Sequence, residues 1–265
     1  MQKLSSTSAT ASSVSAGPTG SCVASGNSSV ATPAPVSVIR SEGPSPKRSA
    51  NRAETTEPMK TAVIGPGGQV YLTDGHHTLT SFWEVAGGGP RTHVRLKVTG
   101  NLSKLAPDAF WREMQTRGWT WLRDADGKTI APEALPKNLG LKQFANDQYR
   151  GVLFFARDIG YSQDDNTPAF QEFYWGHWLR TQTDPSVDPN DFALTEFNPY
   201  LTLVGNVAKA MVALPGDAKI TDTLDANALG RLDAFGEKAF EALSQPLSAP
   251  KPGKLAIALE YKRTH

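Results

Sequence analysis

Cysteine is almost absent, since the chain of 265 residues contains only Cys22. A single thiol excludes an intramolecular disulfide framework and any zinc site built from several cysteines. Cys22 lies in a Ser/Gly-rich stretch with no histidine nearby in the sequence. This argues against a thiol nucleophile, which needs a neighbouring base or cation.

Long hydrophobic runs and excess charge are also absent. No segment reaches the roughly 18 apolar residues of a membrane-spanning helix, and residues 1–20 contain no apolar core of a secretory signal. A cytoplasmic protein is therefore expected, with export to the periplasm as the alternative if the true N-terminus is missing. The net charge of +1 gives no global field, so binding to a polyanion would need a local patch.

The first quarter of the chain has little apolar surface. Residues 1–58 consist mainly of Ser, Ala, Thr, Gly and Pro, and such a composition cannot offset the entropy lost on ordering. We predict a disordered tail over 1–58, a compact domain over 59–183, and a mostly helical C-terminal extension over 184–265 packed on that domain. No pattern indicates an oligomeric state.

Periodicity predicts both strands and helices. A hairpin is expected from strands 60–64 and 69–73, followed by a helix that Asp74 caps and Gly87 ends. The run over 254–263 fits either a strand or a short helix. The other predicted elements are a strand over 91–99 with one buried and one basic face, a helix over 107–117, a strand over 119–122, and helices over 147–159, 168–182, 201–214 and 226–243.

The densest group of polar residues is Asp74-Gly75-His76-His77-Thr78, where a strand runs into a helix N-terminus. The first amides of a helix lack intrahelical partners and carry the positive end of its dipole, so they can hold a phosphate. Gly75 lets a ligand approach the backbone, and Thr78 and the histidines add donors. Alternatively, Asp74 only caps the helix while the histidines pack or face water. Adjacent helical residues point about 100° apart, so we predict no metal site at the two histidines.

A second group of candidate residues lies on two later helices. Arg150 and Arg157 share a helical face and could clamp a phosphate or pair with internal carboxylates such as Glu172; we favour the internal pairing. The aromatic run over 170–178 is typical of a core, and His177 within it is better explained as a hydrogen-bonded core histidine than as a base. The candidates of this group are Tyr149, Arg150, Glu172, His177 and Arg180.

The strand-Asp-Gly-His-His-helix unit resembles the hallmark of the ParB/sulfiredoxin superfamily, and the run from Met59 through Arg180 resembles its ParB-like nuclease branch. The matching features, in chain order, are Gly65-Pro66-Gly67-Gly68, the hallmark itself, Phe110-Trp111, Asp124-Ala125-Asp126-Gly127, Tyr149-Arg150, and Glu172-Phe173-Tyr174-Trp175 through Arg180. The resemblance implies a small mixed sheet with helices and a nucleotide or phosphate pocket at the helix N-terminus. It also implies relatives that act as nucleotide switches, nucleases, or ATP-dependent reductases of oxidised cysteine.

Two departures from the superfamily pattern narrow the chemistry expected of the chain. Thr78 stands where many members carry a phosphate-gripping arginine, and His76 stands where the reductase branch needs a cysteine. The reductase chemistry is therefore absent. A third departure is that residues 1–58 show no sign of the earlier strand and Pro-containing turn that members of this branch usually have before the hairpin. No helix-turn-helix is evident downstream, which argues against a complete partition protein.

Together these observations predict an α+β protein with a ParB/sulfiredoxin-like mixed sheet followed by a helical region. The predicted function is binding of a nucleotide or nucleic-acid phosphate at Gly75–Thr78, with Asp74 and His76 or His77 as general base or metal-activating groups of a phosphodiester hydrolase. Arg150 and Arg180 are the other candidate phosphate ligands, supported by Tyr149, Glu172 and His177. A nucleotide and a divalent metal are the candidate cofactors. The alternative is a non-catalytic module that binds a ligand or a protein.

Overall fold

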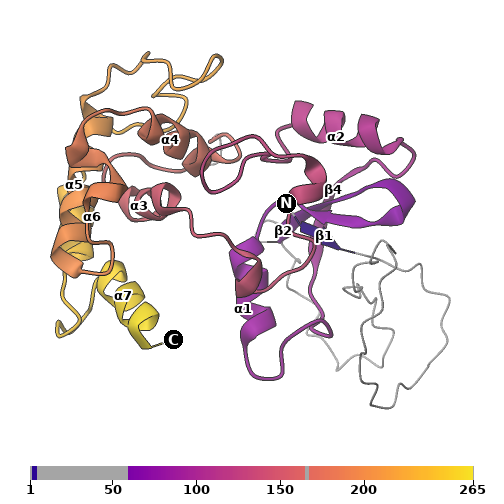
Figure 1. Ribbon diagram of the computed structural model, residues 1–265, viewed down its shortest axis with the longest axis horizontal. Coiled ribbons are helices and arrows are strands. Elements are labelled where there is room, and N and C mark those ends of the chain that lie inside the picture. Colours follow the sequence, from indigo (N-terminus) through magenta and orange to yellow (C-terminus); the bar gives the residue numbers. More distant parts are fainter. Residues whose placement is uncertain (1, 5–58, 165–166, 265) are drawn as a thin grey trace, which may run out of the picture. The chain divides into compact units, whose positions relative to one another are not determined.

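The structure is a computed structural model that describes residues 2–4, 59–164 and 167–264 (Figure 1). The chain forms two compact units: a sheet unit of residues 1–122 and 129–145, and a helical unit of residues 123–128 and 146–265. The tail predicted over 1–58 lies outside the described residues, apart from a strand at its start. The predicted boundary between 183 and 184 falls within the helical unit, and that division of the chain stays a prediction.

Within the described residues, four strands form a small mixed sheet in the order β1-β3-β2-β4. They are β1 (Gln2–Leu4), β2 (Lys60–Ile64), β3 (Val70–Leu72) and β4 (Leu96–Asn101). β3 is antiparallel to β1 and β2, whereas β4 is parallel to β2. The hairpin predicted from the sequence is present as β2 and β3, and Ile64 pairs with Val70 at its closed end.

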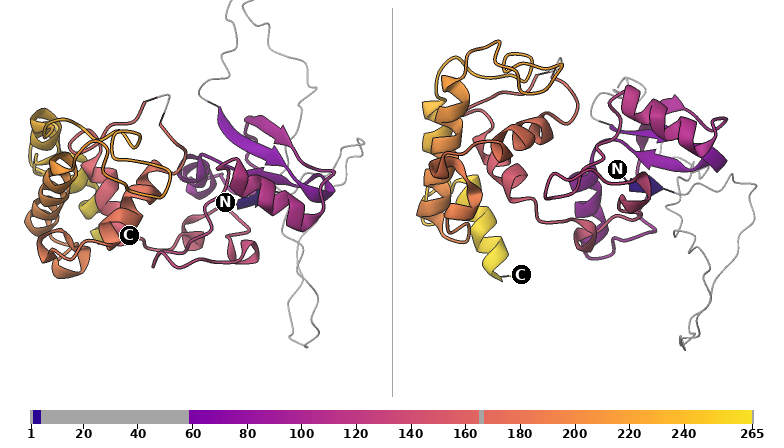
Figure 2. Two further views of the ribbon diagram at one scale, coloured as in Figure 1. Left: turned by 90° about the horizontal axis from the view of Figure 1, so that it is seen from above. Right: turned by 45° about the horizontal axis from the view of Figure 1, so that its top comes forward.

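A helix covers each face of this sheet (Figures 1 and 2). Helix α1 (His76–Glu84) packs Leu79 against the face that carries Ala62, and helix α2 (Pro107–Thr116) packs Phe110 against the face that carries Val63. Adjacent residues of a strand point to opposite faces, so β2 must be apolar at successive positions to bury both. This explains why its sequence reads as a short apolar run rather than as an alternating pattern.

β4 differs from the strand predicted over 91–99. Neighbouring residues of β2 pair with Val98 and Gly100, so Thr99 is an extra residue in a β-bulge. The bulge interrupts the predicted alternation, and Val98 is 52% exposed instead of buried. Gly100 lies so close to Trp119 that a Cβ there would be 2.7 Å from its ring. Packing against Trp119 therefore requires glycine at this position.

The helical unit is built around a larger core. Its helices are α3 (Gln148–Ala156), α4 (Gln171–Arg180), α5 (Phe197–Ala213), α6 (Glu237–Leu243) and α7 (Lys254–Thr264). α3 packs against α4 and α5, and α5 also contacts α7. The largest fully buried side chain of this core is Trp175 on α4, so the aromatic run predicted to be core does contribute to it.

The predicted helix over 226–243 is wrong in its first half, because α6 begins only at Glu237. Backbone groups before it bond to distant segments instead: the amide of Ala226 donates to the carbonyl of Ala218, and that of Gly236 to Ile159. Gly230 has a φ of +67°, which also interrupts a helix. The run over 254–263 is helical, as α7.

The structure confirms the predicted α+β class, with a small mixed sheet followed by a helical region. Among the helices of the described residues, none has the length and apolar character needed to cross a membrane.

Candidate functional site

The Asp74–Thr78 motif forms a tight junction between β3 and α1 in the sheet unit. Gly75 is the N-cap residue of α1, with φ +91° and ψ +17°, and no side chain caps the helix. The prediction that Asp74 caps α1 is therefore wrong. The chain turns at Gly75, which directs the Asp74 side chain toward β2, where it is 65% exposed and pairs with Lys60 (Oδ2 to Nζ, 3.3 Å).

Lys60 belongs to this junction, although the sequence reasoning did not include it. Its side chain lies across Gly75, because a Cβ on Gly75 would stand 2.3 Å from its Cγ. The hairpin register pairs Ala62 with Leu72, and continuing that register by two residues sets Lys60 opposite Asp74. The register could therefore have identified this cation. The uncapped helix start thus has an ammonium group next to it.

The side chains of the first turn of α1 lie in different surroundings. His76 is half-buried, whereas His77 and Thr78 are exposed. The ring of His77 stacks on Phe144, with centroids 5.1 Å apart and an interplanar angle of 3°. Within residues 2–4, 59–164 and 167–264, no group of three or more His, Cys, Asp or Glu side chains could hold a metal ion.

The segment that carries Phe144 is fastened to α1 by hydrogen bonds. The amide of Leu141 donates to Glu84 Oε1 at 2.7 Å, and the amide of Gly140 donates to Thr80 Oγ1 at 3.5 Å. Both acceptors lie on α1, so the segment is attached along the side of that helix. Phe144 was absent from the predicted site because it is far from the motif in the sequence and no local pattern connects the two.

The sheet unit is hollowed on the face of the sheet opposite to α1. The hollow is a pocket of about 360 Å³ with aromatic walls formed by Tyr71, Phe110 and Trp111. Burial raises the pKa of the Tyr71 hydroxyl above its ordinary value. At neutral pH this hydroxyl is protonated and can act only as a hydrogen-bonding group, not as a base.

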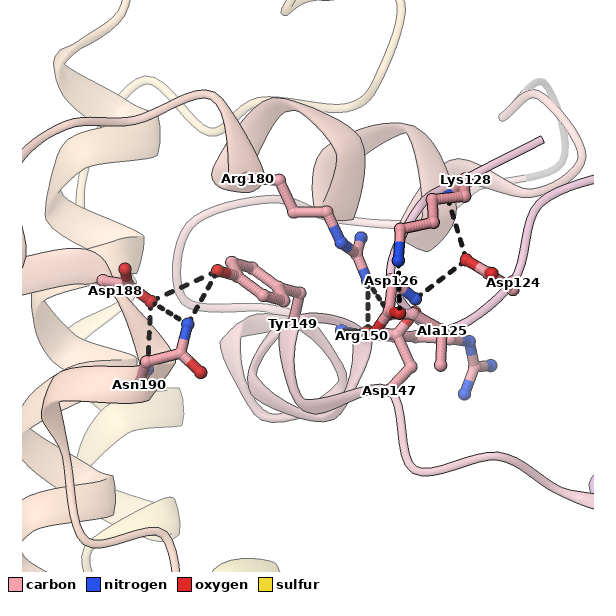
Figure 3. A network of polar contacts seen from close by, with 10 residues as sticks. All are labelled: Asp124, Ala125, Asp126, Lys128, Asp147, Tyr149, Arg150, Arg180, Asp188 and Asn190. Atoms are coloured by element: carbon pink, nitrogen blue, oxygen red, sulfur yellow. Dashed lines mark hydrogen bonds and ion pairs between the residues drawn. The ribbon is translucent and has the colours of Figure 1, made fainter.

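In the helical unit, Arg180 is held in a network of polar contacts (Figure 3). Its Nη2 donates to Asp147 Oδ1 at 2.6 Å and to the carbonyl of Ala125 at 2.7 Å, and its guanidinium lies 4.4 Å from the centre of the Tyr149 ring. Asp147 also caps α3 by accepting from the amide of Arg150. The network therefore ties the 124–128 turn to both α3 and α4.

Tyr149 is anchored at its other end by the loop that follows α4. Its hydroxyl donates to Asp188 Oδ1 at 3.2 Å and accepts from Asn190 Nδ2 at 3.1 Å (Figure 3). Burial, with the charge of Asp188, raises the pKa of Tyr149. The hydroxyl is therefore a protonated hydrogen-bonding group that positions the ring under Arg180.

Glu172 lies between two arginines, Arg150 within α3 and Arg157 at the C-terminal end of that helix. Its Oε2 is 2.9 Å from Arg150 Nη2, and its Oε1 pairs with Arg157. Glu172 is buried, and the Arg150 guanidinium also lies over the ring of Phe173. This arrangement matches the internal ion pairing that the spacing favoured. The assignment of Arg150 and Arg180 as phosphate ligands stays a prediction.

His177 is half-buried on α4. Burial, together with the positive charges of Arg123 and Arg180, lowers its pKa below the ordinary value. The imidazole is therefore neutral at neutral pH. His177 belongs to the helical unit with Tyr149 and Glu172, whereas the Asp74–Thr78 motif belongs to the sheet unit. The candidate residues thus fall into two groups, each brought together within its own unit.

The comparisons with known proteins agree with the resemblance to the ParB-like nuclease branch. A family model described as "Putative ParB-like nuclease" matches residues 35–181, more than half of the chain. The chain belongs to the ParB-like nuclease family that this model describes. Its structure is similar to the crystal structure of protein Atu1540 from Agrobacterium tumefaciens, with a TM-score of 0.45 and 24% sequence identity over 66% of this chain and 80% of that chain. No curated protein matches the sequence.

Proposed function

We propose that this ParB-like protein binds the phosphate of a nucleotide or nucleic acid at Gly75–Thr78 and hydrolyses a phosphodiester there. The observation that carries the proposal is the start of α1. Its N-cap residue, Gly75, has a left-handed backbone conformation, and no side chain caps the helix. A phosphate oxygen can take the place of the missing cap, since helix N-termini attract anions through their amides and dipole. Membership of the ParB-like nuclease family supports the same substrate class.

Lys60 provides a positive charge beside the junction, which a bound anion could contact. Lys60 already pairs with Asp74, and this exposed pair is weak. A bound phosphate would compete with Asp74 for the same ammonium group. We therefore assign Lys60 as a further phosphate-binding residue of the site.

Hydrolysis of a phosphodiester needs two proton transfers. The attacking water loses a proton, and the oxygen that leaves the phosphorus gains one. A neutral histidine can accept the proton of the attacking water, and a protonated one can give a proton to the leaving oxygen. His76 and His77 stand in the first turn of α1, next to the amides that would hold the phosphate. We assign this proton transfer to the two histidines, with Asp74 as the third candidate group.

Replacing both histidines tests the proposal directly. We expect the wild type to cleave a labelled oligonucleotide, assayed with and without a divalent metal. The His76→Ala/His77→Ala variant should lose at least about 100-fold in rate, because general acid–base groups contribute about 10²–10⁴-fold. Gel electrophoresis of the products measures the rate. His93→Ala is the matched control, since His93 is exposed and lies outside the motif.

The outcomes separate the two candidate functions. Unchanged cleavage in the double variant would show that the histidines are not the catalytic groups. Binding without cleavage in the wild type would favour the non-catalytic ligand-binding module. No binding of nucleotides or DNA at millimolar ligand would contradict every phosphate-centred function of this chain.

Lys60→Met tests the electrostatic part of the site. Each phosphate contact made by a cation contributes about 0.7–0.9 to the slope of the logarithm of affinity against the logarithm of salt concentration. We expect Lys60→Met to lower that slope by about this amount, whereas the control Lys97→Met, at an exposed position on β4, leaves it unchanged. Fluorescence anisotropy with a labelled oligonucleotide at several salt concentrations measures the slope. An equal slope in the wild type and Lys60→Met would remove Lys60 from the site.

A further inference from the structure

The proposed proton transfers use the imidazole of His77 but give no role to the stacking of its ring on Phe144. His77 is exposed, Phe144 is 37% exposed, and the two rings are parallel to within 3°. Aromatic pairs in protein cores usually pack offset or edge to face and are covered by other side chains. Here a stack of two rings lies at the surface, at the first turn of α1.

We infer that the His77–Phe144 stack receives the base of an unpaired nucleotide in single-stranded nucleic acid. The inference rests on the proposed function, since it names the substrate class of the same site. An exposed aromatic plane offers its face to another planar ring, and every nucleobase has such a face. The backbone of His77 lies in the first turn that would hold the phosphate, so one residue would contact both the phosphate and the base of a nucleotide.

The surroundings of the stack favour a single strand over a duplex. Phe82 on α1 and Leu141 before Phe144 are further exposed apolar side chains of the two segments that carry the stack. In a duplex the bases are stacked inside, and only phosphates and groove edges are accessible. A protein that binds duplex DNA through phosphates needs a broad basic surface, and this chain has a net charge of +1.

The segment that carries Phe144 is also held in place before any ligand binds. The bonds from Leu141 to Glu84 and from Gly140 to Thr80 attach it to α1. The stack is therefore preorganised, and little side-chain freedom is lost when a third ring is added.

The test compares two ligands with equal numbers of phosphates: a labelled single-stranded oligothymidylate, and an abasic oligomer of the same length. Their affinities for the full chain are measured by fluorescence anisotropy. Stacking on an aromatic ring corresponds to about a 5- to 150-fold change in affinity. We expect Phe144→Ala to weaken binding of the oligothymidylate within this range and to leave binding of the abasic oligomer unchanged.

The matched control is Phe154→Ala, since Phe154 is similarly exposed but belongs to the helical unit. Phe144→Leu keeps the apolar volume without the aromatic ring and should weaken binding nearly as much as Phe144→Ala. Equal affinity of the wild type for the two oligomers would overturn the base platform while leaving the phosphate site intact. Equal losses for both ligands in Phe144→Ala, or tighter binding of duplex than of single strand, would also overturn it. No binding of either oligomer would overturn the proposed function itself.

Discussion

Trp175→Ala is expected to lower the free energy of unfolding of the helical unit by about 3–5 kcal/mol, the range found when large buried aromatic residues are truncated. Trp175 is fully buried and packs edge-on against Trp178 and at a tilt against Tyr161. Its indole Nε1 donates to the carbonyl of Leu229 at 2.8 Å. Alanine would remove the ring from the centre of the core and leave a cavity that the surrounding residues fill only in part.

Trp175→Phe separates the packing from the hydrogen bond. The carbonyl of Leu229 also accepts from Gln171 Nε2 at 2.9 Å, so it keeps one partner when the indole is lost. We therefore expect a loss of about 1–2 kcal/mol, from the smaller ring and the missing bond. The exposed Phe154 of the same unit provides the control, and Phe154→Ala should change stability by less than about 1 kcal/mol.

Urea unfolding followed by far-ultraviolet circular dichroism measures these changes without relying on tryptophan fluorescence. If Trp175→Ala is unfolded in buffer, Trp175→Phe still gives a measurable midpoint. A loss of less than about 1 kcal/mol in Trp175→Ala would show that Trp175 does not lie in a close-packed core.

The sequence predicts local elements well where the pattern itself decides the structure. Helix α2 begins at Pro107, which suits a first helical position because it lacks an amide proton. The helix ends before Gly118, which tolerates the positive φ found there. The hairpin follows in the same way from two apolar runs separated by Gly-Pro-Gly-Gly. These signals act within a few residues, so no tertiary information is needed to read them.

The sequence pattern predicts the wrong element where hydrogen bonds to distant backbone groups determine the local structure. The pattern of residues 226–236 predicts a helix, but the amides at the two ends of this segment bond elsewhere: those of Ala226 and Asn227 to carbonyls at 218 and 216, and those of Leu232 and Gly236 to carbonyls at 160 and 159. Such long-range bonds override a weak intrinsic propensity. The bulge in β4 is a similar case, because the position of the extra residue depends on how β2 pairs with it.

The same distinction applies to the candidate site. The motif at Asp74–Thr78 is local, and its strand-to-helix junction could be predicted. Lys60 could have been found from the hairpin register, because it stands opposite Asp74. Phe144 could not, because only the fold brings it to His77. The helix cap was assigned wrongly because the φ of Gly75 moves the start of α1 one residue beyond the position that Asp74 could cap.

Glu172→Ala is expected to destabilise the helical unit by about 2–3 kcal/mol. Removing one partner of a fully buried ion pair costs about 3–5 kcal/mol, because the remaining charge loses its compensation. Here the side chains of Arg150 and Arg157 are 24% and 35% exposed, so both guanidiniums can partly recover contact with water. Glu260→Ala provides the control, because its ion pair with Arg263 lies at the surface and its loss should change stability far less.

A double-mutant cycle with Arg150→Met assigns the role of Arg150. Arg150→Met alone leaves Glu172 paired with Arg157, so we expect it to cost less stability than Glu172→Ala. The coupling between Arg150 and Glu172 should lie within about 0.5–3 kcal/mol, the range of residues in one network. We also expect Arg150→Met to leave the affinity for an oligonucleotide unchanged, because the guanidinium already pairs with Glu172 and lies over Phe173. Weaker oligonucleotide binding with unchanged stability would instead support Arg150 as a phosphate ligand.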